Sequence, residues 1–356
     1  MQLDFQVMSF DAVDPTSKDF RDAIAVRLGK SAAQADKDLK GLNAKCGELS
    51  DAAACYYEGG KRLRPAFLYW GYSAFAGQPE NPDAILTAGA GFEMLHAGIL
   101  VHDDLIDNSP TRRGQPSAHK HFAELGNEEF GRQSAIVLGD VMLGLANDLV
   151  YGCGLERLSD ALPYWRLVQN EVNAGQYLDV SNQFGLLDEM SARESAELVL
   201  EAKTSRYTVM RPLQFGAAAG GAGERELAKL GDFGSALGKA FQLRDDLLGI
   251  LGDEGVTGKA TGGDLVEGKQ TVLLAITMEK SPHANELASL IGREMSPDAL
   301  ERALNIIMEC GALDDVGELI GGYVKAAYEA LDEVGLSEEA RAPIAQLLVQ
   351  CVDREK

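Results

Sequence analysis

The stretch that decides the fold is DAILTAGAGFEMLHAGILVHDDLID, residues 83–107. Its apolar residues recur at steps of three and four, which is the period of an α-helix, and they do not alternate as in a strand. The segment is apolar around much of its circumference, as expected of a helix in the middle of a bundle. Its last turn holds three acids, Asp103, Asp104 and Asp107. The stretch therefore predicts a core helix with carboxylates at its C-terminal end.

The rest of the chain also follows a helical period. Helices are expected at 131–151, at 191–218 and from about 225 to 250, and Pro212 should kink or interrupt the second of them. The C-terminal third predicts four shorter helices, at 283–294, 297–310, 313–334 and 337–351. No β-rich block is visible. We expect a single all-α domain of ten or more helices over residues 16–356, preceded by a loosely ordered extension, residues 1–15.

Composition excludes several classes of protein. The 356 residues include 33 Lys+Arg and 55 Asp+Glu, a formal net charge of −22, so nucleic acid and anionic membrane surfaces would be repelled. The five cysteines are scattered without a CxxC pair, which is typical of a reduced protein without a structural zinc site. We expect the first twenty residues not to be a secretory signal, and we expect no stretch to reach the roughly 20 apolar residues that span a bilayer. We expect a cytoplasmic protein without a transmembrane segment.

The first acidic group has the spacing of a magnesium site. Asp103 and Asp107 are four residues apart, which places them about 40° apart around a helix. Mg²⁺ commonly takes one or two carboxylates together with waters and substrate phosphates. The alternative is a solvated helix end, although negative charge at a helix C-terminus opposes the helix dipole. The pair therefore predicts a bound cation.

A second polar group lies far along another apolar helix. Gln242, Asp245 and Asp246 stand at i, i+3 and i+4 and share one helix face. Alone, this group would be read as a surface patch. Together with the first acidic group, it becomes a candidate second wall of a metal cluster.

Cations occur where a phosphate ligand would need them. Arginine binds phosphate oxygens as a fork and lysine as a point charge. Each cation also has a simpler reading, as a solvated turn, a satisfied core histidine or a lysine with a buried stem, but together they favour a phosphate ligand. The candidates are Lys61, Arg64, His96, Arg112, Arg113, Lys203, Lys259 and Lys269. A phosphate-binding loop of the GxxxxGK[ST] type and a GxGxxG fingerprint are both missing from the sequence.

With these residues in place, the sequence resembles the trans-isoprenyl diphosphate synthases, the polyprenyl synthetase family, over about residues 55 to 350. The resemblance is carried by six blocks in the expected order: GGKRLRP (59–65), EMLHAGILVHDDLIDNSPTRRGQPSAH (93–119), GQYLDV (175–180), KTSRYT (203–208), FQLRDDLLGILGD (241–253) and TGK…EGKQT (257–271). It implies an all-α bundle around a central active-site cavity, the isoprenoid synthase fold, and usually a homodimer.

The resemblance also implies an activity. Isopentenyl diphosphate would be condensed head-to-tail with an allylic diphosphate (dimethylallyl, geranyl or farnesyl) through Mg²⁺-assisted ionisation, condensation and elimination. Asp103 and Asp107 would bind two Mg²⁺ ions and Asp245 a third, with Asp104 and Asp246 in support. The remaining implied roles are allylic diphosphate binding by Arg112, Lys203, Lys259 and Lys269, isopentenyl diphosphate binding by Lys61, Arg64, His96 and Arg113, and carbocation stabilisation near Thr204 and Gln242.

Two positions bear on how the family pattern applies. Gly249 stands where the second acidic motif commonly has its third Asp, and we expect the metal site to be retained. Gly98 and Ile99, five and four positions before Asp103, carry no aromatic ring to block the growing chain, which favours geranylgeranyl diphosphate or a somewhat longer product. Farnesyl diphosphate is the alternative product. A class I terpene cyclase and a non-catalytic regulatory subunit of a heteromeric synthase are the less favoured functions.

Overall fold

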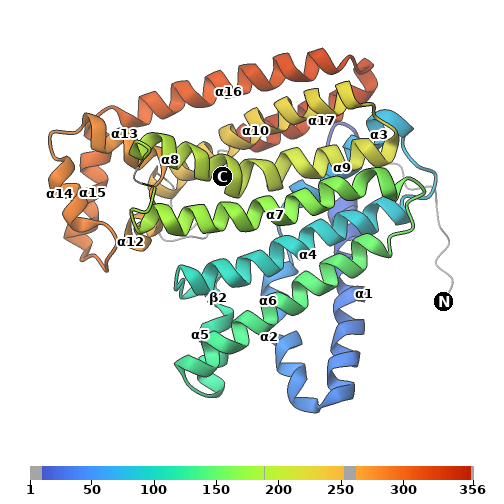
Figure 1. Ribbon diagram of the computed structural model, residues 1–356, viewed down its shortest axis with the longest axis horizontal. Coiled ribbons are helices and arrows are strands. Elements are labelled where there is room, and N and C mark those ends of the chain that lie inside the picture. The colour runs from blue at the N-terminus through green and yellow to red at the C-terminus, as the bar shows by residue number, and fades with distance from the viewer. Residues whose placement is uncertain (1–9, 188, 252–261, 354–356) are drawn as a thin grey trace. The chain divides into compact units, whose positions relative to one another are not determined.

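Helix α4 (Asp83–Ile106) is formed by the stretch that decides the fold, and most of its residues are buried. The computed structural model describes residues 10–187, 189–251 and 262–353 (Figure 1). Their fold is all-α, as predicted, with more than ten helices in this part of the chain. Its only strands are two of two residues each, β1 (Thr111–Arg112) and β2 (Gln115–Pro116).

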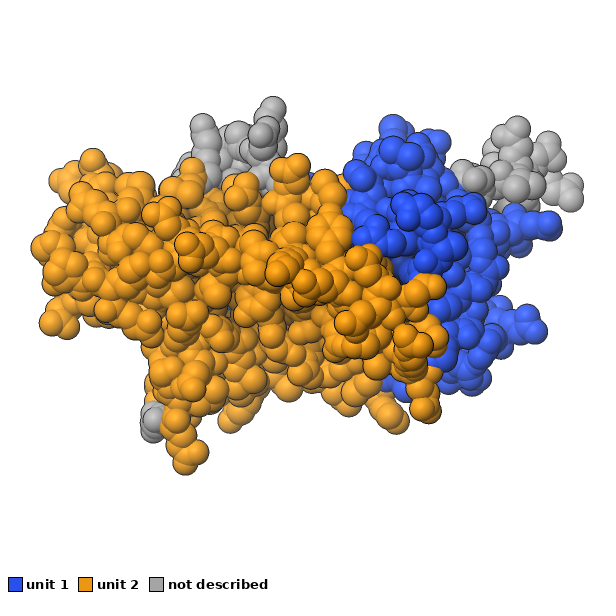
Figure 2. Space-filling model, turned by 90° about the horizontal axis from the view of Figure 1, so that it is seen from above, with its two compact units in different colours: residues 1–163, 212–223, 336–347 blue, residues 164–211, 224–335, 348–356 orange. Residues whose placement is uncertain are grey.

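The chain divides into two compact units (Figure 2). Unit 1 comprises Met1–Pro163, Pro212–Gly223 and Leu336–Leu347, and unit 2 comprises Tyr164–Arg211, Glu224–Gly335 and Leu348–Lys356. The single domain over 16–356 and its central cavity stay predictions. Each unit is described by itself below.

Unit 1 is built around α4. Its other elements are α1 (Lys18–Leu42), η1 (Ala44–Cys46), α2 (Gly47–Tyr57), α3 (Leu63–Ala76), the two strands, α5 (Ala118–Leu125), α6 (Glu128–Tyr151), the start of α7 (Leu158–Gln183), most of α9 (Arg211–Gly220) and most of α17 (Glu338–Val352). Helix α6 packs along α4 at short range because small residues face it. A Cβ added at Gly91 would lie 3.0 Å from the carbonyl oxygen of Ala146, and one added at Gly98 would lie 3.2 Å from that of Gly139.

The strands β1 and β2 form a tight hairpin directly after the first acidic group. Arg112 pairs with Gln115, so the loop consists of Arg113 and Gly114. Both loop residues have positive φ, 51° and 74°. Such a pair is typical of a type I′ turn, whose twist matches that of the strands. The hairpin therefore turns two consecutive arginines back towards the end of α4.

The end of the predicted N-terminal extension is attached to unit 1. Phe10 is buried, and its ring lies edge-on to those of Phe20 and Tyr69. The backbone N–H of Phe10 donates to Gln78 Oε1 at 3.1 Å, and Gln78 Nε2 donates back to the Phe10 carbonyl at 3.2 Å. Residues 1–9 of that extension lie outside the described residues.

Unit 2 is also built of helices, several of them long. Its elements are α7 (Leu158–Gln183) from Tyr164 onward, α8 (Ala192–Val199), η2 (Leu200–Met210), α10 (Glu224–Leu251), α12 (Gly263–Glu267), α13 (Val272–Lys280), α14 (Ala284–Leu290), α15 (Pro297–Glu309), α16 (Ala312–Val334) and the end of α17 (Glu338–Val352). Helix α16 runs along α10 (Figure 1). A capping box of Ser191 and Glu194 begins α8, and Ser296 caps α15 ahead of Pro297.

The interruption predicted around Pro212 takes the form of a change in helix type. The chain stays helical from Ala192 to Gly220, but Leu200–Met210 is a π-helix and the α-helical pattern returns at Arg211. A proline inside an α-helix lacks an N–H and its ring meets the carbonyl four residues back, and wider π turns relieve this conflict. The hydrogen-bonding register is therefore interrupted, while the helix continues.

Two helices of unit 1 are long and apolar enough to cross a membrane by length and composition alone, contrary to the expectation from the sequence. They are α4 and α6. The apolar stretch of α4 is 72% buried, which marks it as a core helix, whereas that of α6 is only 33% buried. The exposed residues of α6 include Ile136 and Val137, together with Asp140 and Asp148.

Candidate functional site

The first acidic motif separates into an outer pair and a buried member. Asp103 and Asp107 are half-buried on the same side of α4 as His96 and Ile99. Asp107 ends the helix, and its backbone N–H donates to the Asp103 carbonyl at 2.8 Å. Asp104 is turned away from them and fully buried. The pair that was predicted to hold metal is therefore the more accessible pair of the three acids.

Asp104 is held by an arginine fork and a tyrosine. Arg112 Nε donates to both carboxylate oxygens, at 3.1 and 3.0 Å, and Arg112 Nη2 donates to Oδ1. The Tyr56 hydroxyl donates to Oδ2 at 2.9 Å. Burial would lower the pKa of the Arg112 guanidinium, but the hydrogen bonds and charge of Asp104 outweigh it and raise that pKa. Asp104 thus holds Arg112, and its expected supporting role at the Mg²⁺ ions stays a prediction.

The basic turn before α3 is fixed by an arginine that sequence reasoning had not selected. Arg62 has φ 56°, is buried, and donates to Glu93 Oε1 at 2.8 Å and to the Tyr57 carbonyl at 2.7 Å. Its neighbour Lys61 is exposed. Arg64 is the second residue of α3, and its side chain is half-buried. A buried ion pair of this kind fixes the backbone, so the turn can present Lys61 and Arg64.

The hairpin and the basic turn meet within unit 1. The guanidinium of Arg113 lies beside Gly60, with Nη2 3.4 Å from an added Cβ there. Burial lowers the pKa of Arg113. Burial, followed by the nearby charge of Arg64, lowers the pKa of His96 well below its usual value, so its imidazole is neutral at pH 7. Three of the residues expected to bind isopentenyl diphosphate, Arg64, His96 and Arg113, are therefore electrostatically coupled.

The second acidic motif in unit 2 repeats the arrangement of outer and buried acids. Gln242 and Asp245 are half-buried on α10, and Asp246 is 6% exposed. Gln242 Nε2 donates to Asp246 Oδ1 at 2.8 Å. Burial, and then the charge of Asp264, raise the pKa of Asp246 to about 7. The three residues share a face as predicted, with Asp245 the more accessible carboxylate.

Gly249 has no carboxylate of its own, but the carboxylate of Asp264 lies close to it. Asp264, on α12, has its Oδ2 3.5 Å from an added Cβ at Gly249. Lys269 Nζ lies 3.5 Å from Asp264 Oδ1 and 2.6 Å from Glu267 Oε2. Sequence reasoning missed Asp264 because it is distant along the chain from the second motif. Lys259 lies outside the described residues.

The π-helix η2 presents Lys203 and Thr204, both half-buried. Lys203 Nζ lies 2.6 Å from Asp179 Oδ2, on α7. Asp179 belongs to the GQYLDV block but had been given no role. π-Helical turns are frequent at functional sites because they change the direction of side chains on an otherwise regular helix.

The carboxylates suit magnesium held partly by its substrate. Among the described residues, no cluster gathers three or more His, Cys, Asp or Glu side chains in a way that would hold a metal without other ligands. Mg²⁺ does not require such a cage, because it takes one or two carboxylates with waters and phosphate oxygens. The outer pair Asp103 and Asp107, and separately Asp245, fit this mode of binding.

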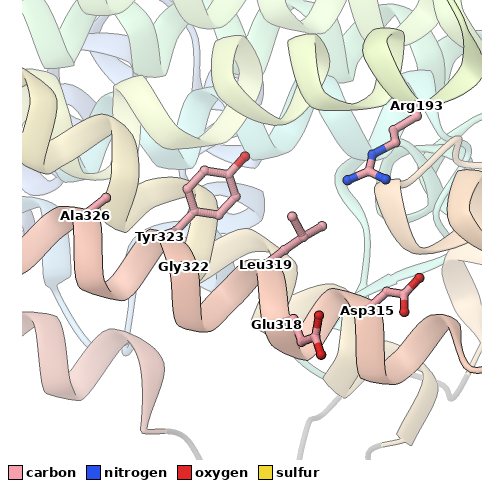
Figure 3. A pocket seen from close by; sticks show the side chains of 7 residues that line it. All are labelled: Arg193, Asp315, Glu318, Leu319, Gly322, Tyr323 and Ala326. Atoms are coloured by element: carbon pink, nitrogen blue, oxygen red, sulfur yellow. The ribbon is translucent and has the colours of Figure 1, made fainter.

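A broad groove in unit 2 has the wrong chemistry for this role. It is lined by residues of α16 and by Arg193 at the start of α8 (Figure 3). Arg193 forms an ion pair with Glu197, with Nε 3.0 Å from Oε1. Asp315 forms an ion pair with Lys280, with Oδ2 2.7 Å from Nζ. None of the residues predicted to bind phosphate or metal lines this groove.

Comparisons with known proteins find similar sequences and structures. The family model described as Polyprenyl synthetase matches residues 47–307. The geranylgeranyl diphosphate synthase of Methanosarcina mazei is 31% identical over 83% of this chain and 85% of its own length. The geranylfarnesyl diphosphate synthase of Aeropyrum pernix is 32% identical over 84% and 91%. A crystal structure of geranylgeranyl pyrophosphate synthase from Corynebacterium glutamicum, complexed with isoprenyl diphosphate and magnesium, matches with a TM-score of 0.88 and 32% identity, covering 94% of this chain and 99% of that one.

Proposed function

Since this chain belongs to the polyprenyl synthetase family and is a trans-prenyltransferase, we propose that it condenses isopentenyl diphosphate head-to-tail with an allylic diphosphate. The observation that carries this proposal is the end of α4. There, two half-buried carboxylates, Asp103 and Asp107, share the last turn of α4 with the buried Asp104, which holds Arg112 in place. Carboxylates beside a fixed arginine suit a metal-bound diphosphate.

The allylic diphosphate departs first in this proposal. Asp103, Asp107 and Asp245 would hold Mg²⁺ ions, three in all, which when bound neutralise the negative charge that develops on the leaving diphosphate. Arg112 and Lys203 are each proposed to donate hydrogen bonds to the allylic diphosphate. Lys259 and Lys269 are proposed to assist them.

Isopentenyl diphosphate would be held by the basic turn and the hairpin of unit 1. Lys61, Arg64 and Arg113 supply positive charge, and the neutral His96 supplies an N–H donor without adding charge. Thr204 and Gln242 would direct oxygen dipoles at the allylic carbocation. The double bond of isopentenyl diphosphate then attacks, and the released diphosphate takes the proton, so no side-chain base is required.

The proposed product is geranylgeranyl diphosphate or a somewhat longer prenyl diphosphate. Both relatives named above make products in this range by their names, and no observation favours farnesyl diphosphate. Ile99 lies half-buried on the side of α4 that carries Asp103. Gly98 instead faces α6, where an added Cβ would lie 3.2 Å from Gly139 O and from Met142 Cβ. Of the two positions, Ile99 is therefore the better candidate for contact with the growing chain.

We also propose that the protein is a cytoplasmic homodimer. The support for the dimer is two neighbouring apolar side chains of α6, Ile136 and Val137, which are 49% and 50% exposed. Exposed apolar surface of this kind is typical of a protein interface. Sedimentation analysis of the wild type and of Val137→Lys tests this: a dimer that the charge dissociates supports it, and a wild-type monomer contradicts it.

The decisive experiment is incubation of the purified chain with labelled isopentenyl diphosphate, Mg²⁺ and each allylic primer in turn. We expect prenyl diphosphates whose dephosphorylated alcohols correspond to geranylgeraniol or longer, and none when EDTA removes the metal. Hydrocarbon formed from the allylic diphosphate alone would identify a cyclase. No turnover with any primer would point to a regulatory subunit.

A further inference from the structure

The Tyr56 hydroxyl lies at the junction of three segments in unit 1. It donates to Asp104 Oδ2 on α4 at 2.9 Å, and it accepts the backbone N–H of Ala118, the first residue of α5, at 2.9 Å. Tyr56 itself belongs to α2 and is 1% exposed. We propose that Tyr56 is a positioning residue for the reaction: through Asp104 it sets the orientation of Arg112 towards the allylic diphosphate.

Burying the charged carboxylate of Asp104 costs free energy. Its carboxylate is completely buried, and such a charge is tolerated only when it is paired and hydrogen-bonded. Arg112 occupies both oxygens with its Nε and Nη2. Tyr56 supplies the remaining donor to Oδ2. Without that donor, the carboxylate would have to turn or draw in water, and its arginine would turn with it.

The orientation matters because a guanidinium has two usable edges. Asp104 engages the edge formed by Nε and Nη2, which leaves the N–H groups of Nη1 directed elsewhere. The Arg112 side chain is 17% exposed and the Asp104 side chain 0%, so the solvent side of the pair belongs to the arginine. A phosphate oxygen would meet the edge that Asp104 does not use. The angle of that edge depends on how firmly Asp104 is held.

Tyr56 also links this pair to the hairpin that carries Arg112. Ala118 follows β2 by two residues, and its N–H is bound by the same hydroxyl that binds Asp104. Burial, and then the charge of Asp104, raise the pKa of the Tyr56 hydroxyl, so it remains a protonated donor across the physiological range. One oxygen therefore fixes both the carboxylate and the start of the segment after the hairpin.

The test is steady-state kinetics of Tyr56→Phe with the allylic diphosphate and isopentenyl diphosphate varied separately. The ring is retained, and the lost hydrogen bond involves a charged partner, so we expect KM for the allylic diphosphate to rise roughly tenfold. KM for isopentenyl diphosphate should stay unchanged. Loss of folded protein alone would lower the apparent kcat and leave both KM values as they are, so a fall in kcat without the selective rise in KM overturns the proposal.

Tyr57→Phe is the matched control, because Tyr57 is the next residue of α2 and its hydroxyl makes neither contact. It should leave both KM values unchanged. Arg112→Gln separates this inference from the proposed function on which it rests: if Arg112→Gln leaves the allylic KM unchanged, the role of Arg112 fails. If it raises the allylic KM while Tyr56→Phe does not, only the role of Tyr56 fails.

The double variant measures the coupling. Because Tyr56 is proposed to act only through Arg112, Tyr56→Phe should add little to the allylic KM of Arg112→Gln, and full additivity would overturn the proposal. Asp104→Asn is the second variant for the same kinetic test if Tyr56→Phe does not fold. It retains the shape of the side chain and should show the same selective rise, and an unchanged ratio of the two KM values in that variant also counts against the proposal.

Discussion

Gly175 and Lys203 are in backbone contact between α7 and η2. A Cβ added at Gly175 would lie 2.5 Å from the Cα of Lys203 and 2.6 Å from the carbonyl carbon of Ala202. Glycine at this position therefore lets the π-helix approach α7 closely enough for Lys203 to reach Asp179 at 2.6 Å. On the other side of η2, an added Cβ at Gly238 would lie 2.5 Å from the Cα of Ser205.

Gly175→Ala should therefore displace Lys203 from its ion pair, even though alanine is the better helix former. We expect kcat to fall about tenfold and KM for the allylic diphosphate to rise, since a misplacement of about 1 Å is sufficient for such losses. Gly317→Ala on α16 is the matched control, because an added Cβ there meets nothing within 4 Å. Equal kinetics in the two variants would contradict this account of Gly175.

Asp103→Ala and Asp245→Ala should each lower turnover by about a hundredfold or more, because each removes a proposed Mg²⁺ ligand. The fold should remain intact, as judged by circular dichroism and thermal melting. The control is Asp148→Ala, an exposed acid of α6. Steady-state rates equal to wild type in the two variants would exclude both carboxylates from the reaction.

Asp264→Asn tests whether the acid beside Gly249 contributes to the second motif. Its carboxylate raises the pKa of Asp246, which shows that its charge is felt there. We expect the Mg²⁺ concentration for half-maximal rate to rise severalfold in the variant, because negative charge near a divalent cation favours binding. Asp298→Asn on α15 is a comparison acid outside the motif. An unchanged Mg²⁺ requirement would show that Asp264 does not take the place of the aspartate that is missing at position 249.

Ile99→Phe and Gly98→Phe should have different effects. Ile99→Phe places a ring on the half-buried side of α4 and should shorten the product, as measured by chromatography of the dephosphorylated alcohols. Gly98→Phe forces a ring against α6 and should lower the free energy of unfolding by about 1–3 kcal/mol, the usual range for overpacking. A shortened product from a fully stable Gly98→Phe would show that the chain passes α4 on the other side.

His119 should make the protein sensitive to mild acid. Its side chain is buried, and burial lowers its pKa, so the folded protein holds fewer protons on it than the unfolded chain does. The free energy of unfolding should then fall as the pH drops below about 6.5, the pKa in the unfolded state. Urea titrations at pH 7.5 and 5.5 would measure this. His119→Gln should reduce the difference between the two pH values, and an undiminished difference would assign the effect to other groups.

The helices could be predicted because their causes are local in the sequence. The apolar period of 83–107 and the breaks at Ser-Pro and Gly-Leu-Ser gave bounds within a few residues of α4, α15 and α16. The π-helix before Pro212 could not be predicted, because its cause is a conflict between the proline ring and a carbonyl one turn away.

The same limit applies to the candidate site. Asp103, Asp107 and Asp245 were found from spacing, since i, i+3 and i+4 positions share a helix face. Tyr56, Asp179 and Asp264 were not found, because each acts on a residue that is distant along the chain. Only the fold brings Tyr56 to Asp104, and no pattern within the Tyr56 segment indicates that contact.

Non-glycine residues with a left-handed backbone conformation lower the stability of the folded chain. Among the described residues, Arg62, Asn108 and Arg113 are the non-glycine residues with positive φ. A side chain in this conformation costs about 1 kcal/mol that glycine would not. Selection for heat resistance alone would therefore favour glycine at 113, in a loop that already contains one. Arginine at 113 therefore lowers thermal stability relative to glycine, and a thermostable variant that keeps it would have to gain stability elsewhere in the fold.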